Sequence, residues 1–238
     1  MNLKRFQTSK SGSRFLTTFP VMNYRQPLEE GAYFHVYGRT VGKEMAFNFP
    51  GFTKLFDQKR DRLIHPYVDI CADCIMGNHF HSEWRIKPVD ETLRLRIARE
   101  RTVAGRQYLA GAIPYSDFLV RQVQRLLIGC ANWYNKKNDR HGALFQKGFK
   151  RIRIRSHQKL LYYLAYIHCN SRHHRVKHNF QNYARSSYQA FLSDKPSRYA
   201  VAHVLSWFDP DPATARQAFV ALHENFRVEE TAEVGFFE

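Results

Sequence analysis

Two histidines that flank one phenylalanine, His79 and His81, end the stretch IMGNHFH (75–81). Side chains at positions i and i+2 of a β-strand point to the same face, so on a strand the two imidazoles would lie side by side. Imidazole suits Mn²⁺ or Zn²⁺ better than Mg²⁺, and phosphate oxygens in the same coordination sphere widen the choice. The pair is therefore a candidate metal site. The alternative is two half-exposed histidines on a basic protein.

A phenol and an amide form a second candidate site. Tyr166 and Asn170 are four residues apart in AYIHCN (165–170), a spacing that places both on one face of a helix. A tyrosine oxygen can act as a nucleophile that forms a covalent intermediate. A helical tyrosine is more often part of the core, however, and Tyr162 and Tyr163 are equally available by composition.

Other residues near these motifs could also bind a metal. Glu83, two residues after His81, shares its strand face and is either a further ligand or a solvated carboxylate. Cys71 and Cys74 would face opposite sides of a strand, which argues against a zinc site, and we expect the four cysteines to be reduced and buried. Zinc or phosphate could also be contacted by four histidines whose alternative is a basic flexible segment: His168, His173, His174 and His178.

The charge of the chain favours a polyanionic partner. Lys and Arg outnumber Asp and Glu by 37 to 21, which gives a net charge of +16 and suits a nucleic acid. The basic residues are dense in 136–159, where Asp139 is the one acid, whereas residues 205–238 are acidic. We expect the nucleic acid to contact Lys147, Lys150, Arg151, Arg153, Arg155 and Lys159. Trp133, Tyr134 and Phe149 would stack on bases or belong to the core.

Composition argues against several other classes. The hydrophobic fraction of 44% is enough for a sizeable core and too high for a disordered chain. A membrane span needs roughly 18 consecutive apolar residues, and the sequence has no such run. The N-terminal residues lack the apolar stretch of a secretion signal, so we expect a cytoplasmic, nucleoid-associated protein.

Hydrophobic periodicity predicts the elements that would position these residues. Expected strands are 32–39, 65–76, 79–86 and 150–154, with a turn at Gly77-Asn78. Expected helices are 51–63, 88–111, 115–138, 156–170 and 211–226. Within 65–76 we expect Val68, Ile70, Ala72 and Cys74 to share one face. Ser116 or Asp117 would cap one helix and Ser156 another. This order predicts an α+β fold with an antiparallel sheet, the ferredoxin-like or split βαβ arrangement.

In this order, the segments FHVYGR, IMGNHFH, GALFQKGFKRIRI, YLAYIHCN and SSY resemble the single-tyrosine HUH transposases, and among them the REP-associated tyrosine transposases. The resemblance runs from about residue 32 to 190. It divides the chain into an N-terminal arm (1–30), a transposase domain (31–190) and a C-terminal helical tail (191–238). Two family prolines are replaced, one by Gly77 in the metal strand motif and one by Ser171 after the tyrosine motif.

The resemblance implies the HUH endonuclease fold, in which the tyrosine helix packs near the histidine pair. It assigns a divalent metal, Mg²⁺ or Mn²⁺, to His79, His81 and Asn170, and the nucleophile to Tyr166. It also implies a metal-dependent endonuclease and strand transferase that cuts single-stranded DNA beside a hairpin through a 5′-phosphotyrosine, with no small-molecule cofactor. A monomer is favoured over a homodimer.

Two other functions are alternatives, and the sequence argues against each: the presence of His79, His81, Tyr166 and Asn170 argues against the first. A domesticated HUH domain would hold structured DNA without cutting it. An RNA-binding domain of the same ferredoxin-like shape would need aromatic pairs on the open sheet face, where the histidines stand instead.

Overall fold

The computed structural model describes residues 25–42 and 44–227, which form a mixed α/β structure around one four-stranded antiparallel sheet. The strand order is β2-β3-β1-β4. The strands are β1 (Tyr33–Arg39), β2 (Val68–Ile75), β3 (His79–Ile86) and β4 (Lys150–Ile154). The α-helices are α1 (Phe52–Leu63), α2 (Glu91–Arg99), α3 (Val103–Leu109), α4 (Tyr115–Lys137), α5 (His157–His173), α6 (Tyr188–Phe191), α7 (Val201–Leu205) and α8 (Pro212–Asn225). Two short 3₁₀ turns are Ala46–Asn48 and Phe180–Asn182.

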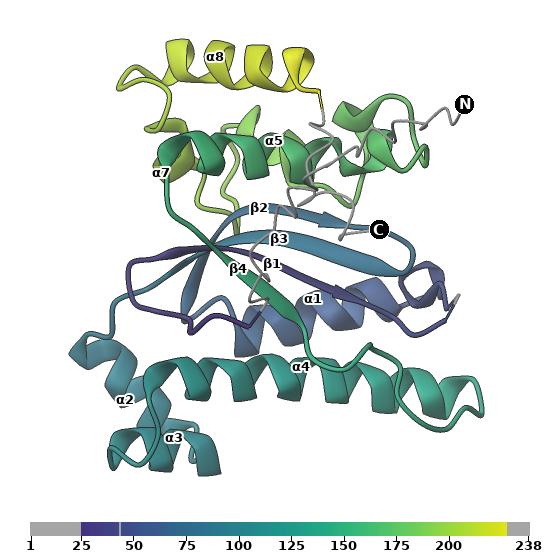
Figure 1. Ribbon diagram of the computed structural model, residues 1–238, viewed down its shortest axis with the longest axis vertical. Coiled ribbons are helices and arrows are strands. Elements are labelled where there is room, and N and C mark those ends of the chain that lie inside the picture. The colour runs from purple at the N-terminus through teal and green to yellow at the C-terminus, as the bar shows by residue number, and fades with distance from the viewer. Residues whose placement is uncertain (1–24, 43, 228–238) are drawn as a thin grey trace, which may run out of the picture.

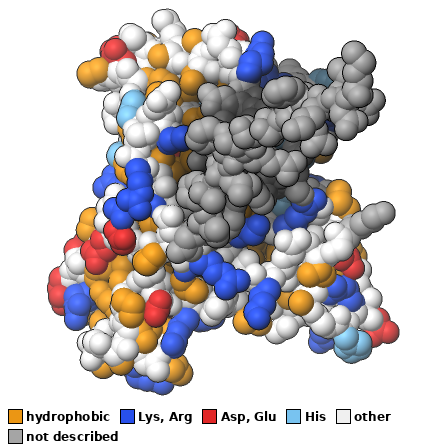
Figure 2. Space-filling model, viewed as in Figure 1, with side chains coloured by type: hydrophobic (Ala, Val, Ile, Leu, Met, Phe, Trp, Pro, Cys, Tyr) orange, Lys and Arg blue, Asp and Glu red, His pale blue; other side chains and the backbone are white. Residues whose placement is uncertain are grey.

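The helices lie in layers on both faces of the sheet (Figure 1). Helices α1 and α4 cover one face, while α5 covers the other and carries α8 on its outer side. In the same orientation, Lys and Arg side chains are scattered over much of the visible face (Figure 2). Within the described part of the chain, no helix has the length and apolar character needed to cross a bilayer.

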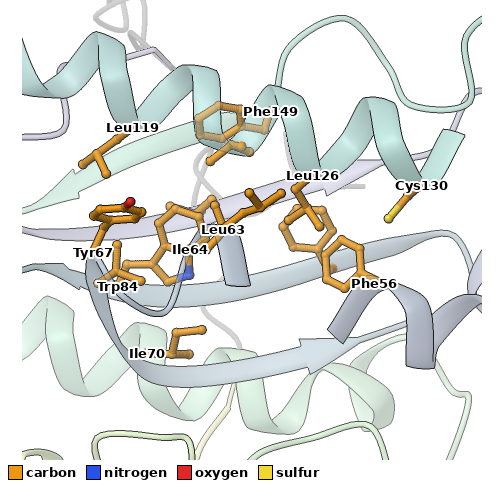
Figure 3. Packing of buried hydrophobic residues seen from close by; sticks show 14 of the residues in the cluster. Phe56, Leu63, Ile64, Tyr67, Ile70, Trp84, Leu119, Leu126, Cys130 and Phe149 are labelled. Atoms are coloured by element: carbon orange, nitrogen blue, oxygen red, sulfur yellow. The ribbon is translucent and has the colours of Figure 1, made fainter. Parts of the chain in front are cut away.

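The period-2 alternation of the strands divides the buried residues into two cores. Phe34 and Val36 of β1 and Trp84 of β3 belong to the core that includes residues of α1 and α4. Figure 3 shows Trp84 in this core together with Phe56 and Leu126. Tyr37 of β1 and the side chains of β4 at positions 152 and 154 point toward α5. His79 and His81 also lie on the α5 side, because they alternate with Phe80 of the first core.

A β-bulge changes the expected pattern of β2. The ladder between β2 and β3 shifts between Ile70 and Ala72. As a result, Val68 and Ile70 belong to the core under α1 and α4, whereas Ala72 and Cys74 belong to the core under α5. The prediction that these four residues share one face is wrong, because one extra residue reverses the facing of every side chain beyond it.

Several predicted elements are confirmed, and two details are wrong. The strands and the helices at 51–63 and 115–138 lie within a few residues of their expected bounds, and Ser156 caps α5 by accepting a hydrogen bond from the Lys159 amide. The expected helix at 88–111 is two helices, because Arg101 has a positive φ and Thr102 starts a new helix as its cap. Helix α4 begins after Pro114, without a side-chain cap.

Candidate active site

The histidine pair of β3 meets the tyrosine helix α5. The rings of His79 and His81 have their centroids 5.2 Å apart. The ring of Tyr166 lies edge-on to His81 at 5.6 Å. All three side chains are buried, with exposed fractions of 7% for His79, 1% for His81 and 1% for Tyr166. His81 and Tyr166, which belong to two separate sequence motifs, therefore lie in contact.

A neighbouring amide fixes the protonation of His79. Nδ1 of His79 donates a hydrogen bond of 2.6 Å to Oδ1 of Asn78, because that oxygen can only accept. Burial lowers the pKa of His79 to about 3, helped by the nearby charges of His174 and Arg39, so the ring is neutral at neutral pH. Nε2 then keeps its lone pair, and it is buried with no hydrogen-bond partner among the described residues. This is the state of an imidazole that is ready to bind a metal.

Asn170 is the third side chain of this cluster. It is completely buried, and it stands close enough to His79 for its amide to act on the histidine pKa in the raising direction. Among the described residues, neither its amide oxygen nor its amide nitrogen is within hydrogen-bond geometry of a partner. Among the described residues, no three His, Cys, Asp or Glu side chains form a metal site by themselves. Asn170 thus places an amide oxygen and an amide nitrogen beside the histidine pair.

The three tyrosines of α5 have different surroundings. Tyr166 contacts His81, and its ring lies 6.0 Å from that of His35. Tyr163 stacks on His35 at 4.6 Å. The described ring contacts of Tyr162 are to its two neighbouring tyrosines and to Phe226. Of the three, Tyr166 is the one whose described ring contacts include a member of the histidine pair of β3.

Two further histidines belong to the cluster: His35, which was not predicted from the sequence, and His174, which was considered there as a possible zinc or phosphate contact. His35, in the strand motif FHVYGR, is fully buried and bonds through Nε2 to Nδ1 of His81 at 2.9 Å. His174, which the sequence places in a basic segment after the helix, has its ring 4.9 Å from that of His79. The period-2 pattern of β1 could have shown that His35 shares a face with Tyr37, but not that this face meets His81.

Comparisons with known proteins give one structural likeness. The chain is similar to a solved structure of a REP-associated tyrosine transposase bound to a REP hairpin, with a TM-score of 0.48 and 12% sequence identity over 75% of this chain and 91% of that chain. No protein-family model matches the sequence. No curated protein matches it either.

The basic residues expected to bind DNA lie on both faces of the sheet. The ammonium of Lys150 lies 5.4 Å from the ring centre of Tyr37, and that of Lys159 lies 5.3 Å from the ring centre of Tyr162. Since Tyr37 stacks on His81 and Tyr162 on Tyr166, each lysine stands one aromatic ring away from the site.

The arginines of β4 face the opposite way. Arg151 donates hydrogen bonds to the backbone carbonyls of residues 25 and 26, and Arg153 pairs with Glu29. Lys147 and Arg155 are exposed. Of the aromatic residues considered for base stacking, Tyr134 and Phe149 are buried in the core under α4. The structure therefore brings Lys150 and Lys159, rather than the whole basic segment, to the candidate site.

Two further groups noted in the sequence are buried as well. Glu83 is fully buried, so the solvated carboxylate considered for it is wrong. Its two oxygens have no hydrogen-bond partner within residues 25–42 and 44–227, and burial raises its pKa well above the usual range. All four cysteines are buried and free, as expected.

A buried hydrogen-bond chain holds α5 in place. Nδ1 of His223 donates to the carbonyl of Phe219, so Nε2 of His223 accepts from Nδ1 of His168 at 2.8 Å. Nε2 of His168 then accepts from the Ser187 hydroxyl, whose oxygen accepts from the Asp73 amide. The chain joins α8, α5 and β2, and His168 lies between Tyr166 and Asn170 in sequence. Residues 212–225, expected in a C-terminal tail, thus brace the tyrosine helix.

Proposed function

We propose that this chain is a metal-dependent endonuclease and strand transferase for single-stranded DNA, acting through a covalent tyrosine intermediate. The observation that carries the proposal is the contact of Tyr166 with His81, with Asn170 beside His79. A nucleophile and a set of metal-binding groups, from elements far apart in sequence, then share one site. The order of the motifs, which resembles that of the single-tyrosine HUH transposases, supports the same function.

The topology supports an HUH fold of the ferredoxin-like type. The chain order is β1, α1, β2, β3, α4, β4, and the spatial order of the strands is β2-β3-β1-β4. A split βαβ arrangement has the same alternation of strands and crossover helices. The tyrosine helix α5 follows this unit directly, which brings Tyr166 over the central strands β1 and β3.

His79, His81 and Asn170 would hold the divalent metal. Both histidine rings are neutral because burial lowers their pKa values, and Asn170 adds an amide oxygen. Such a ligand set of nitrogen and oxygen suits Mn²⁺ and accepts Mg²⁺ when phosphate oxygens join it. When bound, the metal polarises the scissile phosphate and offsets the charge that develops on its oxygens.

Tyr166 carries out the bond exchange. Its phenol oxygen attacks phosphorus and loses its proton, a new P–O bond forms to the tyrosine, and the bond from phosphorus to the 3′-oxygen breaks. The products are a 5′-phosphotyrosine and a free 3′-OH. Attack by a DNA 3′-OH on this linkage reverses the exchange and joins strands without ATP. Lys150 and Lys159, one ring away from the site, would guide the DNA backbone.

The proposal is tested by trapping the intermediate. Labelled single-stranded hairpin DNA is incubated with Mn²⁺ or Mg²⁺, and the protein is examined for a covalent DNA adduct under denaturing conditions. We expect an adduct in the wild type and in Tyr162→Phe, and none in Tyr166→Phe. An adduct that persists in Tyr166→Phe would assign the nucleophile to another residue. The absence of any adduct with either metal would refute the proposed enzymatic activity.

A second candidate function is binding of structured DNA without cleavage. It is favoured by burial, because Tyr166 and His81 are each only 1% exposed and a phosphate must reach both for the reaction. A chain that binds hairpin DNA tightly but forms no adduct with either metal would have this function.

A further inference from the structure

The buried hydrogen bond between His81 and His35 has no role in the reaction described above. Nδ1 of His81 and Nε2 of His35 are 2.9 Å apart, and both side chains are shielded from water. A neutral imidazole carries one N–H, so one of these rings donates and the other accepts. The direction of this bond decides what the opposite nitrogen of His81 can do.

Only one direction leaves His81 able to bind a metal through Nε2. If Nδ1 of His81 donates, Nε2 keeps a lone pair and is a ligand. If Nε2 of His35 donates instead, the single proton of His81 sits on Nε2 and blocks ligation. In metal-binding histidines, the nitrogen that does not bind the metal usually donates its N–H to a carboxylate or a carbonyl, which leaves the other nitrogen unprotonated. His79 does so through Asn78, whereas the partner of His81 is another imidazole.

Glu83 is placed to set that direction. It is the residue directly opposite His35 in the ladder between β1 and β3, on the same sheet face, where paired Cβ atoms lie about 5 Å apart. Its carboxyl group is fully buried, and neither oxygen has a hydrogen-bond partner in the part of the chain that the structure describes. An uncompensated buried carboxyl is costly, so a function is a reasonable cause of its presence.

We propose that Glu83 and His35 are positioning residues that select the metal-binding tautomer of His81. In this relay a carboxyl oxygen of Glu83 accepts from Nδ1–H of His35, its partner in the ladder. Nε2 of His35 then accepts from Nδ1–H of His81, and Nε2 of His81 faces the metal with its lone pair. This relay extends the arrangement of a carboxylate behind a metal-bound histidine by one imidazole, and it rests on the proposed function.

A purely structural role for His35 makes a different prediction. The His35 ring stacks between Tyr163, at 4.6 Å, and Tyr37, at 5.2 Å, so a ring of similar size would preserve this packing. His35→Phe keeps the ring and removes the hydrogen bond. His35→Gln loses the ring but keeps an oxygen that can accept from His81 and an N–H that can donate to Glu83. The two variants therefore separate packing from hydrogen bonding.

The experiment has one readout without metal and one with it. In the metal-free protein with ¹⁵N-labelled histidine, NMR reports which nitrogen of His81 carries the proton, assigned by comparison with His81→Gln. Titration with Mn²⁺, followed by EPR, reports metal affinity. We expect the proton on Nδ1 in the wild type. Mn²⁺ affinity should fall about 10- to 100-fold in His35→Phe and Glu83→Leu, and far less in His35→Gln.

Two results would overturn the relay. One is a proton on Nε2 of His81 in the metal-free wild type, which needs no variant and no metal. The other is Mn²⁺ affinity in a folded His35→Phe or Glu83→Leu within twofold of the wild type. If the wild type binds no Mn²⁺, or binds it as well after His79→Ala, the proposed metal function fails instead. The NMR result still decides the tautomer in that case.

Discussion

The ring of Tyr166 on α5 lies edge-on to the ring of His81 on β3, with their centroids 5.6 Å apart. The contact is long-range in sequence, because α2, α3, α4 and β4 lie between the strand and the helix that carry the two residues. The contact follows from the docking of α5 on the sheet. That docking depends on buried bonds such as the one between His168 and Ser187, so stability and chemistry are linked in this region.

The first prediction concerns Asn170. Its amide is buried without hydrogen-bond partners, a cost that Asn170→Ala removes, while the smaller side chain leaves a cavity that costs free energy. These effects oppose each other, so we expect the free energy of unfolding to change by less than about 1 kcal/mol. The covalent adduct should fall at least tenfold, since a metal ligand is lost. Urea denaturation and the adduct assay measure the two effects.

Asp73 provides the contrast. It forms a buried ion pair with Arg60 at 2.7 Å. Asp73→Asn removes the fully buried counter-charge of Arg60 and leaves the guanidinium with the partly exposed Asp57, at 2.9 Å, as its described carboxylate partner. We expect a loss of about 3 kcal/mol. A loss of that size in Asn170→Ala would contradict the view that Asn170 is retained for binding rather than for stability.

The second prediction concerns the two lysines beside the site. We expect Lys150→Ala and Lys159→Ala each to weaken binding of single-stranded DNA and to reduce the slope of log K against log salt by about 0.7, since each removes one phosphate contact. Arg153→Ala serves as the control, because Arg153 pairs with Glu29 on the other face of the sheet. Equal effects of all three variants would show that DNA follows β4 rather than the face that carries Tyr166.

Local periodicity was sufficient to predict most of the elements that carry the site. The alternation around His79 and His81 predicts that both lie on one face of a strand. The spacing of Tyr166 and Asn170 predicts that both lie on one face of a helix. The cap at Ser156 was also predictable, because a serine before an apolar periodic run satisfies the first free amides of a helix.

Long-range relationships could not be predicted in the same way. The hydrogen bond between His35 and His81 depends on the register of β1 against β3, which nothing in either strand specifies alone. The bulge at Cys71 reverses the facing of the rest of β2 without a glycine to mark it. Conversely, the alternation of β4 could have shown that Lys150 and Arg151 face opposite sides, because their spacing is that of neighbours on a strand.

The third prediction concerns acid stability. His168 and His223 are buried and neutral, and burial lowers the pKa of His223 to about 4 from an ordinary value of 6.5. The unfolded chain binds the proton first, so the stabilising contribution is complete above about pH 6.5 and is lost as the pH falls toward 4. Each such histidine contributes a slope of up to about 1.4 kcal/mol per pH unit in this range.

Removing one titrating ring tests this dependence. His223→Gln should be less stable than the wild type at pH 7, because it breaks the chain to His168, but its stability should fall less steeply between pH 6.5 and 4. Chemical denaturation at a series of pH values measures both. An unchanged slope in this variant would mean that His223 takes up no proton on unfolding in that range.

The fourth prediction compares two glycines. A Cβ on Gly38 of β1 would lie 2.7 Å from the ring of Phe80, which is fixed in the core and stands between His79 and His81. A Cβ on Gly129 of α4 would meet only the flexible end of Lys59, at 2.9 Å. Overpacking in a rigid core costs about 1–3 kcal/mol, whereas alanine is favoured over glycine inside a helix by about 1 kcal/mol.

We therefore expect Gly38→Ala to destabilise the protein and Gly129→Ala to leave it unchanged or more stable, as thermal denaturation would show. The functional consequences should differ as well. A shift of the Phe80 ring moves the backbone that carries His79 and His81, so Gly38→Ala should weaken Mn²⁺ binding even at temperatures where the chain is folded. If both variants bind Mn²⁺ like the wild type, the spacing of the two imidazoles does not depend on the packing of β1 against β3 at Phe80.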